Sequence, residues 1–331
     1  MTIKKYGKPA QAVITNKQSF FKKNQYHLDD VLAVNEILKR QPKRNGCKLC
    51  NNSKGKRILV HEIEYLWCEV CGHFTGEFQD TEEYINSLYI DSGGSNYSEN
   101  YKNDYDLRVK DIYLPKANFL HEFMNKNGFK KYSLIDLGCG AGHFVCALNH
   151  IGIDAFGKDV SQELTSQGNK AIGKESLMKM EMNDIYDEIK NSSYDVISLV
   201  GVLEHLDDPL KALSHFYESS SKYLYLQVPL FSLSVLLEAA NPDVFPRQLN
   251  KGHTHLFTKE SLYWLFKKFK LSPEAEWWFG TDMVDLFRHL YVKINSKHAL
   301  DDAYFNDLII CLLYTSPSPR DRQKWGGAGW G

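Results

Sequence analysis

The segment LIDLGCGAGHF, residues 134–144, is the most informative part of the chain. Its apolar half predicts a buried strand through Asp136, and Gly138, Gly140 and Gly142 follow before an apolar helical stretch. Glycine lets the backbone turn sharply and approach a ligand that a Cβ atom would push away. The helix behind such a loop points free N–H groups at the ligand. The segment therefore predicts a ligand site at the carboxyl edge of an α/β sheet.

A dinucleotide site is the obvious alternative for a glycine-rich loop. Here, however, the pattern is DxGxGxG, and His143 stands where a dinucleotide fingerprint has its third glycine. This difference favours a nucleoside that carries a carboxylate over one that carries a pyrophosphate.

Strand and helix patterns alternate along the middle of the chain. We expect strands at 132–137, 153–158, 177–182, 194–200 and 223–228. Strands separated by helices imply right-handed crossovers and a parallel sheet, so the fold class is α/β, doubly wound.

Strand four continues as YDVISLVGVLEHLDDPLKAL, residues 194–213, in which a Glu-His pair precedes Asp-Pro and a helix. Together with the glycine loop, this order of motifs resembles the class I S-adenosylmethionine-dependent methyltransferases over roughly residues 97–270. The resemblance implies a Rossmann-like sheet of seven strands, S-adenosylmethionine as cofactor and methyl transfer as the reaction.

The resemblance also implies a cofactor-binding set. Asp159 stands where the family binds the ribose hydroxyls, and Asp184 where it binds the adenine amine. An aspartate at a strand end can instead simply cap the next helix, and this alternative stays open for both residues. The expected cofactor-binding residues are Asp136, Gly138, Gly140, Gly142, Asp159 and Asp184.

Methyl transfer to an alcohol or carbon acid requires a base. His205 is the best placed candidate, with Glu204 beside it to orient the ring. His253, in the segment GHTHLFT at 252–258, is a second candidate that we expect over the acceptor. Either candidate could instead only shape the pocket, and His253 and His255 could also be an edge-strand feature with one of them facing solvent.

Four cysteines form the second strong pattern, Cys47-x-x-Cys50 and Cys68-x-x-Cys71, separated by seventeen residues. Two such pairs can close tetrahedrally on a structural Zn²⁺ ion, as in a zinc ribbon. His73 is a spare ligand that the four cysteines make unnecessary.

A zinc module before such a domain resembles the sugar C-methyltransferases that act on nucleotide-linked deoxyhexoses. That resemblance implies a small-molecule acceptor, a nucleotide-linked sugar or polysaccharide precursor. In its covering segment the family has a Tyr and a Glu-His pair, and the His matches His253. Asn250 and Gly252 stand at the Tyr and Glu places here, so both O- and C-methylation stay open.

Two other functions are alternatives: a zinc-containing rRNA methyltransferase, and a non-catalytic module that binds S-adenosylmethionine. Strand four is not followed by the Asn/Asp-Pro-Pro-aromatic motif of amino-methylating nucleic-acid enzymes, and the net charge is only −1, which disfavours a nucleic-acid partner. Without an apolar run near ~20 residues or a signal peptide, we expect no membrane partner and a cytoplasmic protein.

The expected organisation has four parts. They are a basic leader at 1–44 with a short helix at 28–40, a zinc module at 45–80, a methyltransferase domain at 81–311 whose residues 230–258 cover the substrate, and a non-native tail at 312–331. The tail is set apart because it lacks helical or strand periodicity, and because CLLYTSPSPRD resembles a translated sequencing adaptor.

Overall fold

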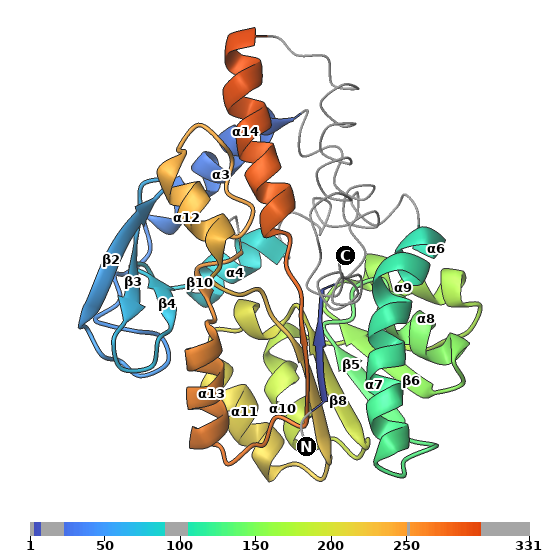
Figure 1. The fold of residues 1–331 in the computed structure, drawn as a ribbon. Helices are drawn as coiled ribbons and strands as arrows, with labels where there is room; N and C mark the ends of the chain where they lie inside the picture. The colour runs from blue at the N-terminus through green and yellow to red at the C-terminus, as the bar shows by residue number, and fades with distance from the viewer. Residues whose placement is uncertain (1–2, 8–22, 90–104, 250–251, 299–331) are drawn as a thin grey trace, which may run out of the picture.

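The computed structural model describes residues 3–7, 23–89, 105–249 and 252–298. A parallel sheet of five strands forms its centre, in the order β7-β6-β5-β8-β9 (Figure 1). The strands are β5 (Ser133–Leu137), β6 (Asp154–Asp159), β7 (Leu177–Lys179), β8 (Val196–Val200) and β9 (Tyr223–Gln227). All five expected strands are present, and the chain winds outward from β5 in both directions, as a doubly wound fold requires.

Helices cover both faces of this sheet. One face carries α7 (Leu114–Lys126), α8 (His143–His150) and α9 (Gln162–Ile172), and the other carries α10 (Ile185–Lys190), α11 (Pro209–Glu218) and α13 (Lys259–Lys268). Successive side chains of a strand point to opposite faces. Accordingly, Leu134 packs in the core beside α7 and α8, whereas Ile135 packs in the core beside α10 and α11.

The sheet differs from the expected seven strands, because the described residues contribute five. The strand that follows α13, β11 (Ala275–Trp278), pairs in parallel with β1 (Ile3–Tyr6) and forms a separate sheet of two strands. Strand β7 is also shorter than expected, since residues Met182–Asp184 form a 3₁₀ helix, η2.

The cysteine region forms a second, antiparallel sheet in the order β10-β4-β3-β2. Its strands are β2 (Gly55–Val60), β3 (Ile63–Cys68), β4 (Phe74–Gly76) and β10 (His255–Leu256). Strand β10 belongs to the expected covering segment, so the sheet of the cysteine region extends beyond residues 45–80. Moreover, Cys47 and Cys68 share one hydrophobic core with Ile197 and Leu213 of the parallel sheet and its helices. The two expected domains are therefore packed as one body.

The remaining helices complete the layers around these sheets. They are α3 (Asn24–Leu38), α4 (Glu82–Tyr89), α6 (Tyr105–Arg108), the π-helix η1 (Val109–Tyr113), the 3₁₀ helix η3 (Leu203–His205), α12 (Leu233–Ala240) and α14 (Asp282–His298). The expected leader helix is α3, which begins four residues earlier than predicted. Residues 8–22 of the leader, Asn250 and the tail at 312–331 lie outside the described residues. Within the described part, no helix is long and apolar enough to cross a membrane.

Candidate functional site

A pocket opens at the carboxyl ends of β5, β6 and β8, the edge where open α/β sheets bind ligands. Its lining comes from the glycine loop, the loops after β6 and β8, and η1. The lining residues are Tyr113, Asp136, Gly138, Cys139, Gly140, His143, Phe144, Asp159, Val160, Ser161, Leu164, Met180, Met182, Ile185, Val200, Gly201, Val202, His205 and Leu206. The structure thus brings the glycine loop, two of the three expected acids and His205 around one cavity.

The three glycines of the loop differ in the space that surrounds them. All three have a positive φ, which side chains rarely adopt. A Cβ on Gly138 would lie 2.5 Å from Val202 Cγ2, and one on Gly142 would lie 2.5 Å from a Leu177 methyl, so packing excludes larger residues there. Gly140 faces open space and lines the pocket, whereas Gly142 begins α8 and is not part of the lining.

The two acids beside the loop are buried. Asp136 is 2% exposed and accepts a hydrogen bond from the Ser198 hydroxyl at 2.6 Å. Burial raises the pKa of Asp136 to about 7. Asp159 accepts the Gly140 N–H at 2.7 Å and the Ser161 N–H at 2.9 Å, and burial raises its pKa above the ordinary value. Asp159 therefore ties the glycine loop to the end of β6.

The sequence left open whether Asp159 and Asp184 only cap the helices that follow them, and neither side chain makes a capping bond. Helix α9 is capped by the Ser161 side chain, so Asp159 is not its cap. Asp184 occupies the residue before α10 without a side-chain capping bond, is exposed, and is not among the lining residues. Its neighbours Met182 and Ile185 line the pocket instead. Asp208, by contrast, caps α11 as the sequence suggests.

Sequence analysis missed an aromatic wall of the pocket. Tyr113 lies at the end of η1 and stacks on His143 with ring centroids 5.2 Å apart. His143 is 2% exposed, and burial lowers its pKa to about 3, so its ring is neutral. The position of His143 after the glycines was a visible signal. Tyr113 gave none, because it precedes the sheet by twenty residues.

The three expected catalytic residues lie close together, and His205 is the one of them that lines the pocket. Glu204 and His205 belong to η3, and His253 comes from the covering segment. The rings of His205 and His253 are stacked with centroids 4.9 Å apart. His205 Nε2 lies 3.9 Å from Glu204 Oε1. We call these three residues the acceptor-end cluster.

Backbone carbonyls orient both rings of the acceptor-end cluster. His205 Nδ1 lies 3.2 Å from the Gly252 carbonyl oxygen, and His253 Nδ1 lies 2.6 Å from that of Gln248. Burial lowers the pKa of His205 to about 3 and that of His253 to about 4. Both rings are therefore neutral at pH 7. Burial also raises the pKa of Glu204 to about 8.

The covering segment is anchored by a buried carboxylate on α12. Glu238 is 1% exposed and accepts the backbone N–H groups of Arg247 and Gln248, each at 2.8 Å. Gln248 in turn offers the carbonyl that His253 contacts. Helix α12 therefore helps to position His253 beside His205.

The four cysteines converge, as the spacing predicts. Cys47 Sγ lies 3.5 Å from Cys71 Sγ, and Cys50 Sγ lies 3.4 Å from Cys68 Sγ. Thiolates bound at about 2.3 Å in a zinc tetrahedron are about 3.8 Å apart, so this donor set fits Zn²⁺. His73 is not directed at the cluster, because its Nε2 lies 3.0 Å from His255 Nδ1. His255 is buried in this pair and does not face solvent.

One lysine connects the cysteines to the pocket. Lys48 follows Cys47, and its side chain is 3% exposed. Its ammonium group donates to the carbonyl of Leu206 at 2.7 Å and pairs with Asp80. Because Leu206 follows His205 directly, the cysteine region and η3 are hydrogen bonded to each other.

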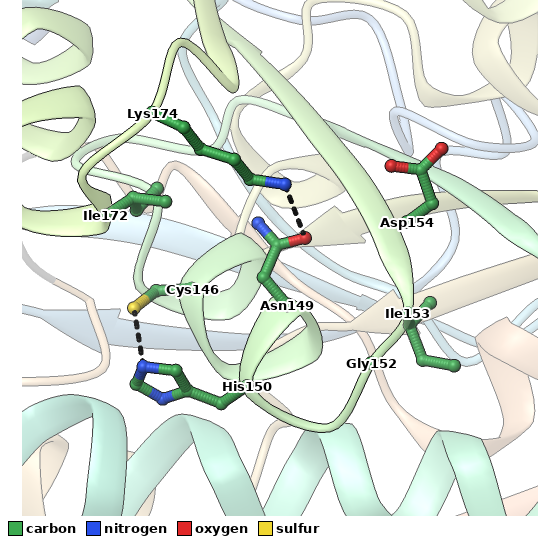
Figure 2. Close-up of a pocket in the computed structure, with 8 residues that line it drawn as sticks. All are labelled: Cys146, Asn149, His150, Gly152, Ile153, Asp154, Ile172 and Lys174. Carbon is green, nitrogen blue, oxygen red and sulfur yellow. Dashed lines mark hydrogen bonds between the residues drawn. The ribbon is translucent and has the colours of Figure 1, made fainter.

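A separate hollow lies at the opposite edge of the sheet, where α8 ends and β6 begins. Figure 2 shows Cys146 beside His150, and Lys174 donating to Asn149 Oδ1 at 3.4 Å. This hollow is at the amino end of β6, away from the glycine loop and the acceptor-end cluster. We assign it no role in the chemistry.

Comparison with known proteins places the chain in a family. A model described as "Methyltransferase domain" matches residues 109–276, which is half of the chain. The chain therefore belongs to the methyltransferase domain family. Comparison with curated proteins gave no match.

Several solved structures are similar to the chain. Magnesium protoporphyrin IX methyltransferase from Synechocystis PCC 6803, with bound SAH, is 14% identical over 57% of this chain and 89% of that chain, with a TM-score of 0.44. A possible histamine N-methyltransferase from Thermotoga maritima is 19% identical over 56% and 79%, with a TM-score of 0.37. An O-methyltransferase family protein from Burkholderia thailandensis is 14% identical over 59% and 58%, with a TM-score of 0.40.

Proposed function

We propose that the chain is an S-adenosylmethionine-dependent methyltransferase that acts on a small molecule, a nucleotide-linked sugar or polysaccharide precursor. The observation that carries the proposal is the placement of Asp136, Asp159 and the glycine loop around one pocket in a chain of the methyltransferase domain family. A bound cofactor would supply an electrophilic methyl group on a sulfonium.

The chain's own residues have distinct tasks in this proposal. The loop at Gly138 and Gly140 admits the cofactor, Asp136 carries negative charge beside a cationic ligand, and Asp159 accepts from the ribose hydroxyls. Asp184, at the rim, accepts from the adenine amine. Tyr113 and the apolar lining exclude water from the pocket.

His205 prepares the acceptor. Burial keeps its ring neutral near pH 7, so one ring nitrogen carries a lone pair that can take the proton of an acceptor hydroxyl or carbon acid during methyl transfer. The Gly252 carbonyl and the stacked ring of His253 hold it in place, with Glu204 beside it. The covering segment reaches this end through His253, whose ring stacks on that of His205, and we infer that the acceptor is a small molecule. Both O- and C-methylation are compatible with this arrangement.

We also propose that the four cysteines hold one structural Zn²⁺ ion. The convergence of four sulfurs in one cluster supports this role, since four-cysteine sites typically hold a structural zinc ion that stabilises the surrounding fold.

Calorimetry tests which cofactor the protein binds. We expect the purified protein to bind S-adenosylmethionine and its demethylated product, and not NADH. Binding of NADH alone would contradict the proposal. For the acceptor, transfer of a radiolabelled methyl group is measured with a panel of nucleotide-linked sugars and with rRNA, and label in rRNA alone would refute the small-molecule class.

A further inference from the structure

The acceptor-end cluster has the composition of a metal site. One ligand atom from each of Glu204, His205 and His253 can be chosen so that all three lie within 4.8 Å of one another. We propose that these residues bind a divalent transition-metal ion, separate from the ion held by the four cysteines, and that this ion binds an oxygen of the acceptor. The inference rests on the proposed function only for the position of the acceptor.

The hydrogen bonds of the two rings support this assignment. Histidines that bind metals almost always donate their other ring N–H to a carbonyl or carboxylate, which sets the tautomer and the ring orientation. In the acceptor-end cluster the Nδ1 atoms of His205 and His253 face the carbonyls of Gly252 and Gln248. With Nδ1 protonated, each neutral ring carries its lone pair on Nε2.

Glu204 provides an independent observation. Its side chain is 3% exposed, and Oε2 is buried without a hydrogen-bond partner among the described residues. A buried polar oxygen without a partner is costly. A cation at this point would satisfy that oxygen.

Two histidines and one carboxylate form a donor set that suits Mn²⁺, Fe²⁺, Co²⁺ or Zn²⁺ and leaves coordination positions open. Ligand atoms at about 2.1 Å from an ion are about 3 Å apart when adjacent, so the three side chains must close by about 1–2 Å. The open positions would take an oxygen-bearing acceptor, such as the vicinal hydroxyls of a sugar.

The cation changes how the acceptor loses its proton. With the ion bound, His205 is a ligand and no longer acts as the base: the ion would lower the pKa of an acceptor hydroxyl as a Lewis acid, and the proton would leave to solvent. The oxygen–methyl bond then forms as the carbon–sulfur bond breaks, and the electron pair of that bond remains on sulfur. The acceptor-end cluster thus acts through the ion and makes O-methylation the expected reaction.

Metal stoichiometry and manganese binding test the proposal in the full chain. Thiolate sites disfavour Mn²⁺, so Mn²⁺ added to the zinc-containing protein reports on the acceptor-end cluster. We expect loss of the free Mn²⁺ electron paramagnetic resonance signal at one equivalent, and two zinc ions per chain after equilibration with Zn²⁺. Glu204→Gln and His253→Gln should each weaken Mn²⁺ binding at least tenfold and retain one zinc. The control His150→Gln should behave as wild type.

Calorimetry with S-adenosylmethionine on the same samples separates the two proposals and checks that the variants fold. If the cofactor binds but neither Mn²⁺ nor a second Zn²⁺ does, the metal site is refuted and the methyltransferase proposal stands. Equal Mn²⁺ binding by wild type and both variants also refutes it. If Mn²⁺ binds and the cofactor does not, the proposed function fails instead.

Discussion

The two larger sheets of this molecule are built by different rules. The parallel sheet takes its strands from one continuous stretch, β5 to β9, joined by helical crossovers. The antiparallel sheet pairs β4 with β10, and the buried contact between His73 and His255 joins residues 182 positions apart. The parallel sheet can therefore be predicted from successive segments of the sequence. The antiparallel sheet cannot, because it depends on a long-range pairing that local sequence patterns do not reveal.

A functional consequence follows from this difference. If the cysteine region were an independent unit, its loss would leave the pocket intact. Because β10 begins at His255, two residues after His253, damage to the antiparallel sheet should reach the acceptor-end cluster. Damage to the glycine loop, by contrast, should impair cofactor binding and leave the antiparallel sheet intact.

Loss of a cysteine should have the largest effect. Cys68→Ser removes a ligand from a site whose metal supplies roughly 10–16 kcal/mol of apparent binding energy, so zinc, β10 and methyl transfer should be lost together. Elemental analysis, thermal unfolding and activity measure this. Cys146→Ser, on α8, is the control and should keep one zinc. Loss of zinc with full activity would show that the sheets are independent.

Gly138→Val should affect cofactor binding next most strongly. Its Cβ would lie 2.5 Å from Val202, and valine tolerates the positive φ poorly, so we expect affinity to fall roughly 100-fold or more while zinc content is unchanged. Calorimetry measures the affinity. Gly128→Val has a similar positive φ but open space around it, and should bind normally. Equal loss in both variants would point to backbone strain instead of the pocket.

His205→Ala should lower kcat by about 10²–10⁴ and leave cofactor affinity within a few-fold, because the residue acts on the acceptor. His253→Ala should raise KM for the acceptor more than it lowers kcat if it only positions the substrate. Steady-state kinetics with His121→Ala as control decide this. If the two variants exchange these behaviours, His253 is the base.

Acidic pH should weaken binding of the cofactor, because Asp136 becomes protonated. Its pKa of about 7 means that the carboxyl group is protonated below pH 7 and charged above it. A cationic ligand prefers the charged form, so affinity should fall from pH 8 to pH 6, by at most about tenfold per pH unit. Asp136→Asn should flatten this dependence in calorimetry. An unchanged slope in the variant would assign the titration to another group.

Lys48→Met tests the connection between the two sheets and should have the smallest effect. It removes a charged hydrogen bond to Leu206, worth roughly 1.5–3 kcal/mol, and should lower both stability and kcat while zinc stays bound. Chemical denaturation and kinetics measure the two changes. Lys54→Met, on the far side of the cysteines, should be neutral. A kcat equal to wild type would mean that η3 is held without this contact.

The features that depend on short segments of the chain could be predicted from the sequence. The five strands, the glycine loop, the acids Asp136 and Asp159 and the convergence of four cysteines follow from alternation and spacing within short segments. Asp184 is exposed because Met182–Asp184 forms a 3₁₀ helix that turns Met182 to the pocket. The pairings of β10 with β4 and β11 with β1 could not be predicted, since short strands far apart in the chain carry no pairing signal.

The pairing of β4 with β10 also implies a delay during synthesis, because β10 is made long after β4. A ribosome that adds roughly 5–20 residues per second needs roughly 10–35 seconds to proceed from β4 to β10. During that interval the cysteines can already hold metal, but β4 presents an unpaired edge, the kind of strand through which nascent chains associate. The covering segment that contains β10 thus also protects the part of the protein that is made first, and slow synthesis or early truncation should favour aggregation of the fragment that contains the cysteines.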